Sequence, residues 1–207
     1  MPGRRTYGDR CGIARALDLV GERWALLVVR ELLLGPKRFT DLRAGLPNIG
    51  PDVLAQRLRE LEERGIVRRG KLPPPAASQI YELTEWGREL EPVVLGLGRW
   101  GSRAPVPSDD APLGADAAML ALKTMFAPPH DVTATYDVRL GDDRYAVRVD
   151  GGRLEITRGT ADGADATIAT DPRTLAAVLW HGHPAEDIEV QGSRRAFRTF
   201  LRLFPMA

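Results

Sequence analysis

A proline-rich segment near the middle of the chain constrains the fold more than any other feature. Residues 102–115 read SRAPVPSDDAPLGA, and each of the three prolines lacks a backbone donor and disfavours helix at the residue before it. Such a segment is typical of a semi-rigid spacer. We therefore predict that the 207 residues divide into a first domain of 1–101, a linker of 102–115 and a second domain of 116–207.

The charge of the chain differs on the two sides of this segment. Residues 1–104 carry 18 Lys+Arg against 13 Asp+Glu, a net charge of +5, whereas residues 105–207 carry 11 against 15, a net charge of −4. A basic front half suits a polyanionic partner, and an acidic back half argues against wrapping of nucleic acid by the whole protein. The sequence shows neither an apolar run of ~20 residues nor a signal-peptide core at its start, so we expect a cytoplasmic protein without a membrane partner.

The front half has the pattern of a helix-turn-helix. Apolar residues at helical spacing predict two helices within residues 13–34, joined at Gly21, and a short helix over 39–44. A further helix is predicted to open at Pro51, a residue favoured in the first helical turn, and to end at Gly65. The order is helix, turn, helix.

The helix that opens at Pro51 presents a polar face suited to DNA bases. Its leucines repeat at i, i+4 and i+7 and predict the inward side: Leu54, Leu58 and Leu61. The outward side then carries Asp52, Ala55, Gln56 and Arg59. Arginine forks onto guanine and glutamine onto adenine, whereas the alternative interpretation is an ordinary solvated face of an amphipathic helix.

Two strand-like segments follow this helix and predict a basic hairpin. They are IVRRGKL and QIYELT, separated by the proline-rich LPPPAAS. A helix-turn-helix followed by such a hairpin is a winged helix, in which one helix enters the major groove and the hairpin lies over phosphates. The residues predicted to contact DNA are Arg38, Thr40, Asp52, Ala55, Gln56, Arg57, Arg59, Arg68, Arg69 and Lys71.

These blocks together carry a family resemblance. The string DRCGIARALDLVGERWALLVVRELLLGPKRFTDLRAGLPNIGPDVLAQRLRELEERGIVRR, followed by YELTEWGREL and GRWG, resembles the HxlR-type winged-helix transcriptional regulators over about residues 9–101. The resemblance implies a dimeric DNA-binding regulator. The sequence departs from the expected pattern in the hairpin tip, where Pro73 to Pro75 and two alanines make the tip longer and less charged, which argues against minor-groove contact there.

One helix is predicted from Glu85 to about Trp100, with Thr84 as its N-cap. Its apolar stripe comprises Leu90, Val93, Val94, Leu97 and Trp100. In the family this helix pairs two subunits, so we expect a homodimer and a near-palindromic operator with half-sites about one DNA turn, ~34 to 36 Å, apart. The alternative is that the stripe packs only on its own domain.

The back half predicts an α+β domain with an antiparallel sheet packed by helices. Strand patterns joined by hairpin turns indicate an antiparallel meander, with helices before and after it. The expected strands are residues 131–140, 144–150, 153–159 and 165–171, and the expected helices are 116–126, 171–182 and 193–204, the last of them capped by Ser193.

The strings ATDPRTLAAVLWHG and IEVQGSRRAFRTFLRLF resemble a sterol-carrier-protein domain of type two over about residues 115–205. Such domains enclose an apolar tunnel, so the resemblance implies a sensor of an apolar or aromatic small molecule. The candidate lining residues are Met119, Met125, Phe126, Trp180, Phe197, Phe200 and Phe204. The alternative is that this aromatic and methionine set only fills a core.

The single cysteine, Cys11, excludes an internal disulfide framework and a multi-cysteine metal site within one chain. It matches an N-terminal cysteine of the HxlR family, which in some members senses oxidants or electrophiles. We expect the neighbouring Arg10 and Arg15 to favour the reactive thiolate. The alternative is a small buried hydrophobic residue.

No arrangement of residues points to an enzyme. No serine stands in a G-x-S-x-G motif, and His181 and His183 near Glu186 form only a weak metal pattern, so we expect no catalytic residue, metal or cofactor. The sequence predicts a dimeric transcriptional regulator with a possible ligand-sensing domain. Two alternatives stay open: a carrier or sensor of apolar molecules with weak non-specific DNA binding, and a thiol-based repressor acting through Cys11.

Overall fold

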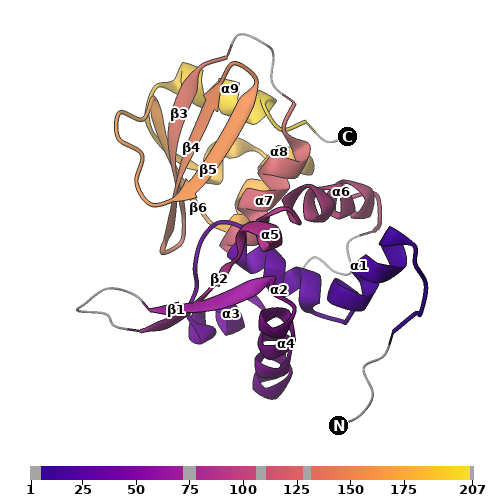
Figure 1. Cartoon of the computed structure of the whole chain (residues 1–207). Coiled ribbons are helices and arrows are strands. Elements are labelled where there is room, and N and C mark those ends of the chain that lie inside the picture. Colours follow the sequence, from indigo (N-terminus) through magenta and orange to yellow (C-terminus); the bar gives the residue numbers. More distant parts are fainter. Residues whose placement is uncertain (1–5, 72–77, 106–110, 128–131, 206–207) are drawn as a thin grey trace. The chain divides into compact units, whose positions relative to one another are not determined.

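The computed structural model describes residues 6–71, 78–105, 111–127 and 132–205 (Figure 1). The chain forms two compact units, Met1–Val94 and Leu95–Ala207. The boundary between the two units falls within the helix Glu91–Gly101.

The first unit is a winged helix. Its elements are α1 (Gly12–Val20), α2 (Ala25–Leu32), α3 (Phe39–Gly45), α4 (Pro51–Glu63), β1 (Val67–Lys71), β2 (Gln79–Leu83), α5 (Glu85–Arg88) and the start of α6 (Glu91–Gly101). The core lies among α2, α3, α4 and the hairpin, where Val28, Leu42 and Leu58 are almost inaccessible to solvent.

The predicted α4 helix and its leucine face are confirmed. Pro51 stands in the first turn, and Leu54, Leu58 and Leu61 are buried. The hairpin is also confirmed, with Val67 opposite Leu83 and Lys71 opposite Gln79. The hairpin is joined to the segment before α3, because Lys37 and Tyr81 exchange backbone hydrogen bonds of 3.0 and 2.8 Å.

The single helix predicted from Glu85 to Trp100 is wrong, because the structure has two helices, α5 and α6. Thr84 caps α5 as expected, its hydroxyl accepting from the Gly87 N–H at 3.0 Å. The break follows from Pro92, which has no N–H to donate back to Arg88 and therefore cannot continue α5. Proline is tolerated in a first helical turn, where Pro92 stands in α6.

The second unit is a five-stranded sheet with helices. Its elements are the end of α6, α7 (Ala115–Met125), β3 (Ala134–Leu140), β4 (Asp143–Asp150), β5 (Arg153–Arg158), β6 (Ala166–Thr170), α8 (Pro172–Trp180), η1 (Ala185–Asp187), β7 (Glu189–Gly192) and α9 (Arg194–Arg202). The strand order is β5-β4-β3-β6-β7.

The sheet is mixed, so the predicted antiparallel sheet is confirmed only in part: β4–β5 and β6–β7 are antiparallel pairs, but the β3–β6 pair is parallel. β3 pairs with β4 in antiparallel fashion, but β6 lies on the other side of β3 and runs parallel to it, with Val138 opposite Ile168. Alternation of side chains identifies a strand and its buried face, but it does not identify the neighbouring strand.

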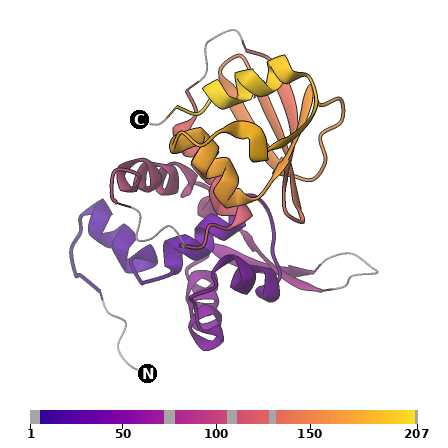
Figure 2. The same cartoon turned by 180° about the vertical axis from the view of Figure 1, so that it is seen from behind.

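Helix α9 covers one face of this sheet (Figures 1 and 2). The ring centroids of Tyr136 and Phe200 lie 5.0 Å apart, and those of Phe200 and Phe204 lie 5.1 Å apart. The Tyr136 hydroxyl donates to the Ala196 carbonyl at 3.2 Å. Ser193 caps α9 as predicted, its hydroxyl accepting from the Ala196 N–H at 3.1 Å. The apolar side of α9 is thereby fixed against the core, which leaves its polar side exposed.

Candidate nucleic-acid interface

The exposed side of α4 holds the residues predicted to touch bases. Asp52, Gln56 and Arg59 are exposed, and Ala55 is half-buried. The Gln56 amide nitrogen donates to the Glu60 carboxylate at 3.0 Å, so its direction is already set. Within the described residues, no carboxylate oxygen lies within 4.0 Å of the Arg59 guanidinium. Arg59 is therefore the arginine of α4 that is available to a partner.

Arg57 lies on a different side of α4 from these residues. Its side chain is buried, and its guanidinium is paired with Glu60 on the same helix and lies 3.9 Å from Glu22. The structure therefore does not place Arg57 with the exposed residues that were predicted to contact DNA. The sequence pattern missed this because an arginine stem covers apolar surface as readily as it reaches into solvent.

The arginines of the hairpin are held by carboxylates. The Arg68 Nε lies 3.0 Å from Glu82 across the two strands, and the Arg69 Nε lies 3.0 Å from Glu62 of α4. The Arg69 guanidinium also lies 5.8 Å from the centre of the Tyr81 ring. These pairs orient the hairpin on α4 and partly neutralise it. The proline tract of the hairpin tip lies outside the described residues.

Lys71 and the start of α3 complete the predicted contact set. Lys71 is exposed at the end of β1, and its ammonium group has no carboxylate partner among the described residues. Arg38 lies 3.7 Å from Asp41, and the Thr40 hydroxyl donates to the same carboxylate at 3.3 Å. The carboxylate of Asp41 also accepts the Arg38 backbone N–H at 3.1 Å, so it serves the start of α3.

A buried charge cluster that the sequence reasoning missed supports this motif. Glu31 of α2 is 1% exposed, and its carboxylate lies 2.5 Å from the Lys37 ammonium and 2.8 Å from the Arg30 guanidinium. A side chain at Gly45 would collide with the Glu31 carboxylate, which these two cations hold in place. The sequence feature that could have revealed this cluster is Glu31 itself, an acidic residue within the largely apolar segment 25–34. The cluster fixes α2 against the end of α3 and thus positions the helix-turn-helix.

The stripe predicted for dimerisation is divided between core and surface. Leu90 and Val94 pack against the core of the first unit. Val93, Leu97 and Trp100 are 49%, 48% and 75% exposed. On α1, Ile13 and Leu17 are exposed as well.

Cys11 is exposed at the N-terminus of α1. The backbone N–H groups of Ile13 and Ala14, at the start of α1, lower the pKa of the Cys11 thiol. We expected Arg10 and Arg15 to favour the thiolate. In the structure the groups that favour it are instead backbone amides at the N-terminus of α1.

Most residues predicted to line a ligand tunnel fill the core of the second unit. Met119, Phe200 and Phe204 are fully buried, and the Trp180 indole N–H donates to the Phe204 carbonyl at 3.1 Å. Met125 and Phe126 are half-buried, with the Phe126 ring 6.0 Å from that of Phe204. Phe197 differs from these, because it lines an open cavity.

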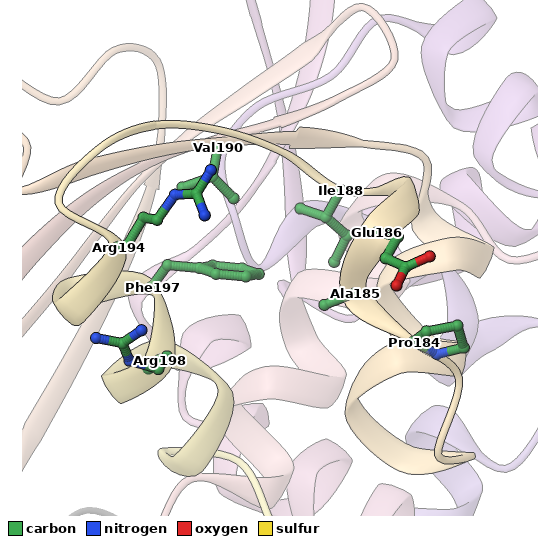
Figure 3. A pocket seen from close by; sticks show the side chains of 8 residues that line it. All are labelled: Pro184, Ala185, Glu186, Ile188, Val190, Arg194, Phe197 and Arg198. Atoms are coloured by element: carbon green, nitrogen blue, oxygen red, sulfur yellow. The ribbon is translucent and has the colours of Figure 1, made fainter.

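The cavity beside Phe197 has a volume of about 510 Å³. Its wall combines apolar and charged side chains from η1, the strand region of β7 and α9 (Figure 3). The lining residues are Pro184, Ala185, Glu186, Ile188, Val190, Arg194, Phe197 and Arg198.

Among the residues that the structure describes, no three His, Cys, Asp or Glu side chains are grouped so that they would hold a metal ion. In the same part of the chain, no helix is long and apolar enough to cross a membrane.

Comparison with known proteins finds a family match that covers most of the first unit and the start of the second. The model of the HxlR-like helix-turn-helix family matches residues 19–108. The HTH-type transcriptional regulator YvaP of Bacillus subtilis is 37% identical over 94 residues, which are 45% of this chain and 87% of that protein. The HTH-type transcriptional regulator YodB of the same organism is 39% identical over 94 residues, 45% of this chain and 84% of its own length.

A solved structure of the redox regulator HypR in its oxidized form is also similar to part of this chain. It is 37% identical, covers 46% of this chain and 99% of its own, and has a TM-score of 0.42.

Proposed function

Since the chain belongs to the HxlR-like helix-turn-helix family, we propose that it is a dimeric transcriptional regulator, not an enzyme, that reads a near-palindromic operator in the cytoplasm. The observation that carries this proposal is the exposed face of α4, where Arg59 has no carboxylate partner within the described residues and Gln56 lies one turn away. Arg59 supplies a fork for guanine, and Lys71 of the adjoining hairpin supplies a phosphate contact. Its relatives are HTH-type transcriptional regulators.

The exposed stripe of α6 supports a homodimer. Val93, Leu97 and Trp100 follow one another at i, i+4 and i+7 and expose large apolar side chains on one helix face. Two copies joined there would present two α4 helices to half-sites about one DNA turn apart. Sedimentation of a Leu97→Glu variant as a monomer, with the parent chain a dimer, supports this arrangement.

The second unit is proposed to act as a ligand-responsive domain of the sterol-carrier type. Its α+β architecture and the open cavity beside Phe197 support this role. A ligand changes DNA binding only through a different affinity for the DNA-bound and free arrangements of the protein. This role requires no metal or cofactor.

The test of the main proposal is a binding titration with DNA. The full chain is titrated with the duplex upstream of its own gene and with a shuffled duplex, each at low and at physiological salt. A preference for the true sequence that persists at the higher salt supports a specific regulator. Equal binding that vanishes for both duplexes overturns it, because phosphate contacts alone are screened by salt.

Cys11 supports a second candidate, a thiol-based repressor. The thiol is exposed, and the helix amides that lower its pKa favour the reactive thiolate. With one cysteine per chain, oxidation to a protein disulfide joins two copies and passes two electrons and two protons to the oxidant. Loss of DNA binding after treatment with diamide, reversed by dithiothreitol and absent in Cys11→Ser, supports this candidate. If diamide abolishes DNA binding of the Cys11→Ser variant as strongly as that of the parent chain, this candidate is overturned.

A further inference from the structure

Helix α9 carries an exposed cationic face that the DNA-binding role does not explain. Its four arginines are all exposed: Arg194, Arg195, Arg198 and Arg202. Within the described part of the chain, none of their guanidinium groups lies within 4.0 Å of a carboxylate. This face stands out in a half of the chain whose net charge is negative.

The placement of these arginines does not favour the stability of the helix. Arg198 lies four residues from both Arg194 and Arg202, a spacing at which like charges on a helix repel. Arg194 and Arg195 stand in the first turn, where the helix dipole disfavours positive charge, and that turn holds no acidic residue. A bound anion would compensate both effects.

Two of the four arginines belong to the cavity described above. Arg194 and Arg198 line it together with Phe197, which lies between them in sequence. In Figure 3 the Phe197 ring projects from α9 towards the side formed by Ile188 and Ala185. The arginines stand on the α9 side, and Glu186 stands on the opposite side. The cavity therefore has an apolar middle and a cationic side.

The chemistry of this wall favours one class of ligand. Ile188, Val190 and Phe197 favour an apolar segment, and two guanidinium groups without carboxylate partners favour an anionic head group. A volume of about 510 Å³ is in the range of small-molecule sites. A nucleic acid would use the four charges of α9 but would leave the apolar wall unused.

We propose that the cavity between η1, β7 and α9 binds a small amphiphile that has an anionic head group, a carboxylate or a phosphate, and a short apolar tail. Arg194 and Arg198 hold the head group, and Phe197, Ile188 and Val190 contact the tail. Arg195 and Arg202 lie outside the cavity wall and are not needed. An effect of this ligand on DNA binding rests on the proposed ligand-responsive role of the second unit. Binding of the ligand to the cavity does not depend on that role.

Calorimetric titration of the full chain tests the site with three probes. Octanoate has both parts of the ligand, octan-1-ol has the tail without the charge, and acetate has the charge without the tail. We expect saturable binding of octanoate that is at least about tenfold tighter than that of either other probe. Octyl phosphate and inorganic phosphate, titrated in the same way, show which head group is preferred.

Paired variants separate the site from the general charge of α9. Arg194→Gln/Arg198→Gln is expected to weaken octanoate binding about tenfold. Arg195→Gln/Arg202→Gln removes the same charge from the same helix and should leave octanoate binding within about twofold. All four arginines are exposed, so we expect both double variants to fold. Circular dichroism checks that they do.

Three results would overturn the proposal. They are absence of saturable binding of both octanoate and octyl phosphate, binding of octan-1-ol as tight as that of the tighter of these two anions, and equal loss of binding in the two double variants. Equal loss together with salt-sensitive binding of duplex DNA to α9 would identify a nucleic-acid surface instead. If octanoate binds but leaves operator affinity unchanged, the site stands and the ligand-responsive role fails.

Discussion

The arginines of the winged helix and those of α9 differ in what surrounds them. In the first unit Arg30, Arg57, Arg68 and Arg69 each lie within 4.0 Å of a carboxylate. In α9, four exposed arginines have no such partner among the described residues. The basic half of the sequence thus uses much of its charge internally, and the acidic half presents a cationic face. Local pairing, rather than the net charge of a segment, determines which cations a partner can reach.

The paired arginines of the first unit have a geometric task. The Arg69–Glu62 pair joins β1 to α4, and the Arg68–Glu82 pair joins the two strands of the hairpin. Exposed pairs of this kind contribute little stability, ~0.2 to 1 kcal/mol each. Their effect is to orient the hairpin beside α4, which is the arrangement that a winged helix needs on DNA.

The largest effect is expected from breaking the buried pair of the first unit. Lys37→Met removes one of the two cations that lie on the Glu31 carboxylate, which is 1% exposed, and leaves Arg30 as the other. Removing one partner costs about 3 to 5 kcal/mol of unfolding free energy where the buried charge is left uncompensated, and the Arg30 pair places the expected loss at the lower end, about 3 kcal/mol. Hydrogen exchange of the α2 amides measures this loss for the first unit alone.

Arg38→Gln is the matched control, because its pair with Asp41 is half-exposed on both sides and 3.7 Å long. It should change the free energy of unfolding by less than about 1 kcal/mol. Equal losses for Lys37→Met and Arg38→Gln would show that the buried cluster does not stabilise the helix-turn-helix.

The next effect separates the available arginine of α4 from the lysine of the hairpin. Arg59→Ala is expected to reduce the preference for the operator over a shuffled duplex by about 1 to 3 kcal/mol, because a fork onto guanine is lost. Lys71→Gln should weaken all duplexes alike and reduce the salt slope by ~0.9. Competition titrations at two salt concentrations measure both. Equal weakening of all duplexes by Arg59→Ala would show that Arg59 contacts phosphate instead of a base.

The sequence predicted the helices and the hairpin well because their signals are local. Leucines at helical spacing identified α4, and Thr84 and Ser193 marked helix starts. Partners distant in the sequence were not predictable. The parallel pairing of β3 with β6 depends on which strand β6 adjoins, and the burial of Arg57 depends on Glu60 and Glu22. A cavity likewise depends on packing, so Phe197 was found by residue type but Arg194 and Arg198 were missed.

A smaller effect follows from releasing the hairpin arginines. Glu82→Gln frees Arg68 and removes a carboxylate that repels phosphate. We expect tighter binding to all duplexes, about two- to fivefold at low salt, with the gain lost at high salt because it is electrostatic. Glu63→Gln is the control, since Glu63 is exposed on α4 and makes no ion pair with the hairpin arginines. An equal gain in both variants would indicate a change in overall charge rather than release of Arg68.

The smallest expected effect is a gain in the stability of α9 when one of its arginines is removed. Arg198→Gln removes the repulsion from Arg194 and Arg202, each worth about 0.2 to 0.5 kcal/mol at this spacing, and glutamine has nearly the helix propensity of arginine. The variant should therefore stabilise α9 by roughly 0.4 to 1 kcal/mol, measured by hydrogen exchange of the α9 amides at low salt. Arg153→Gln, exposed on β5 away from that helix, should leave these amides unchanged. Destabilisation of α9 by Arg198→Gln would mean that this guanidinium is attracted by a group of the protein itself, and α9 would then no longer contrast with the paired arginines of the hairpin.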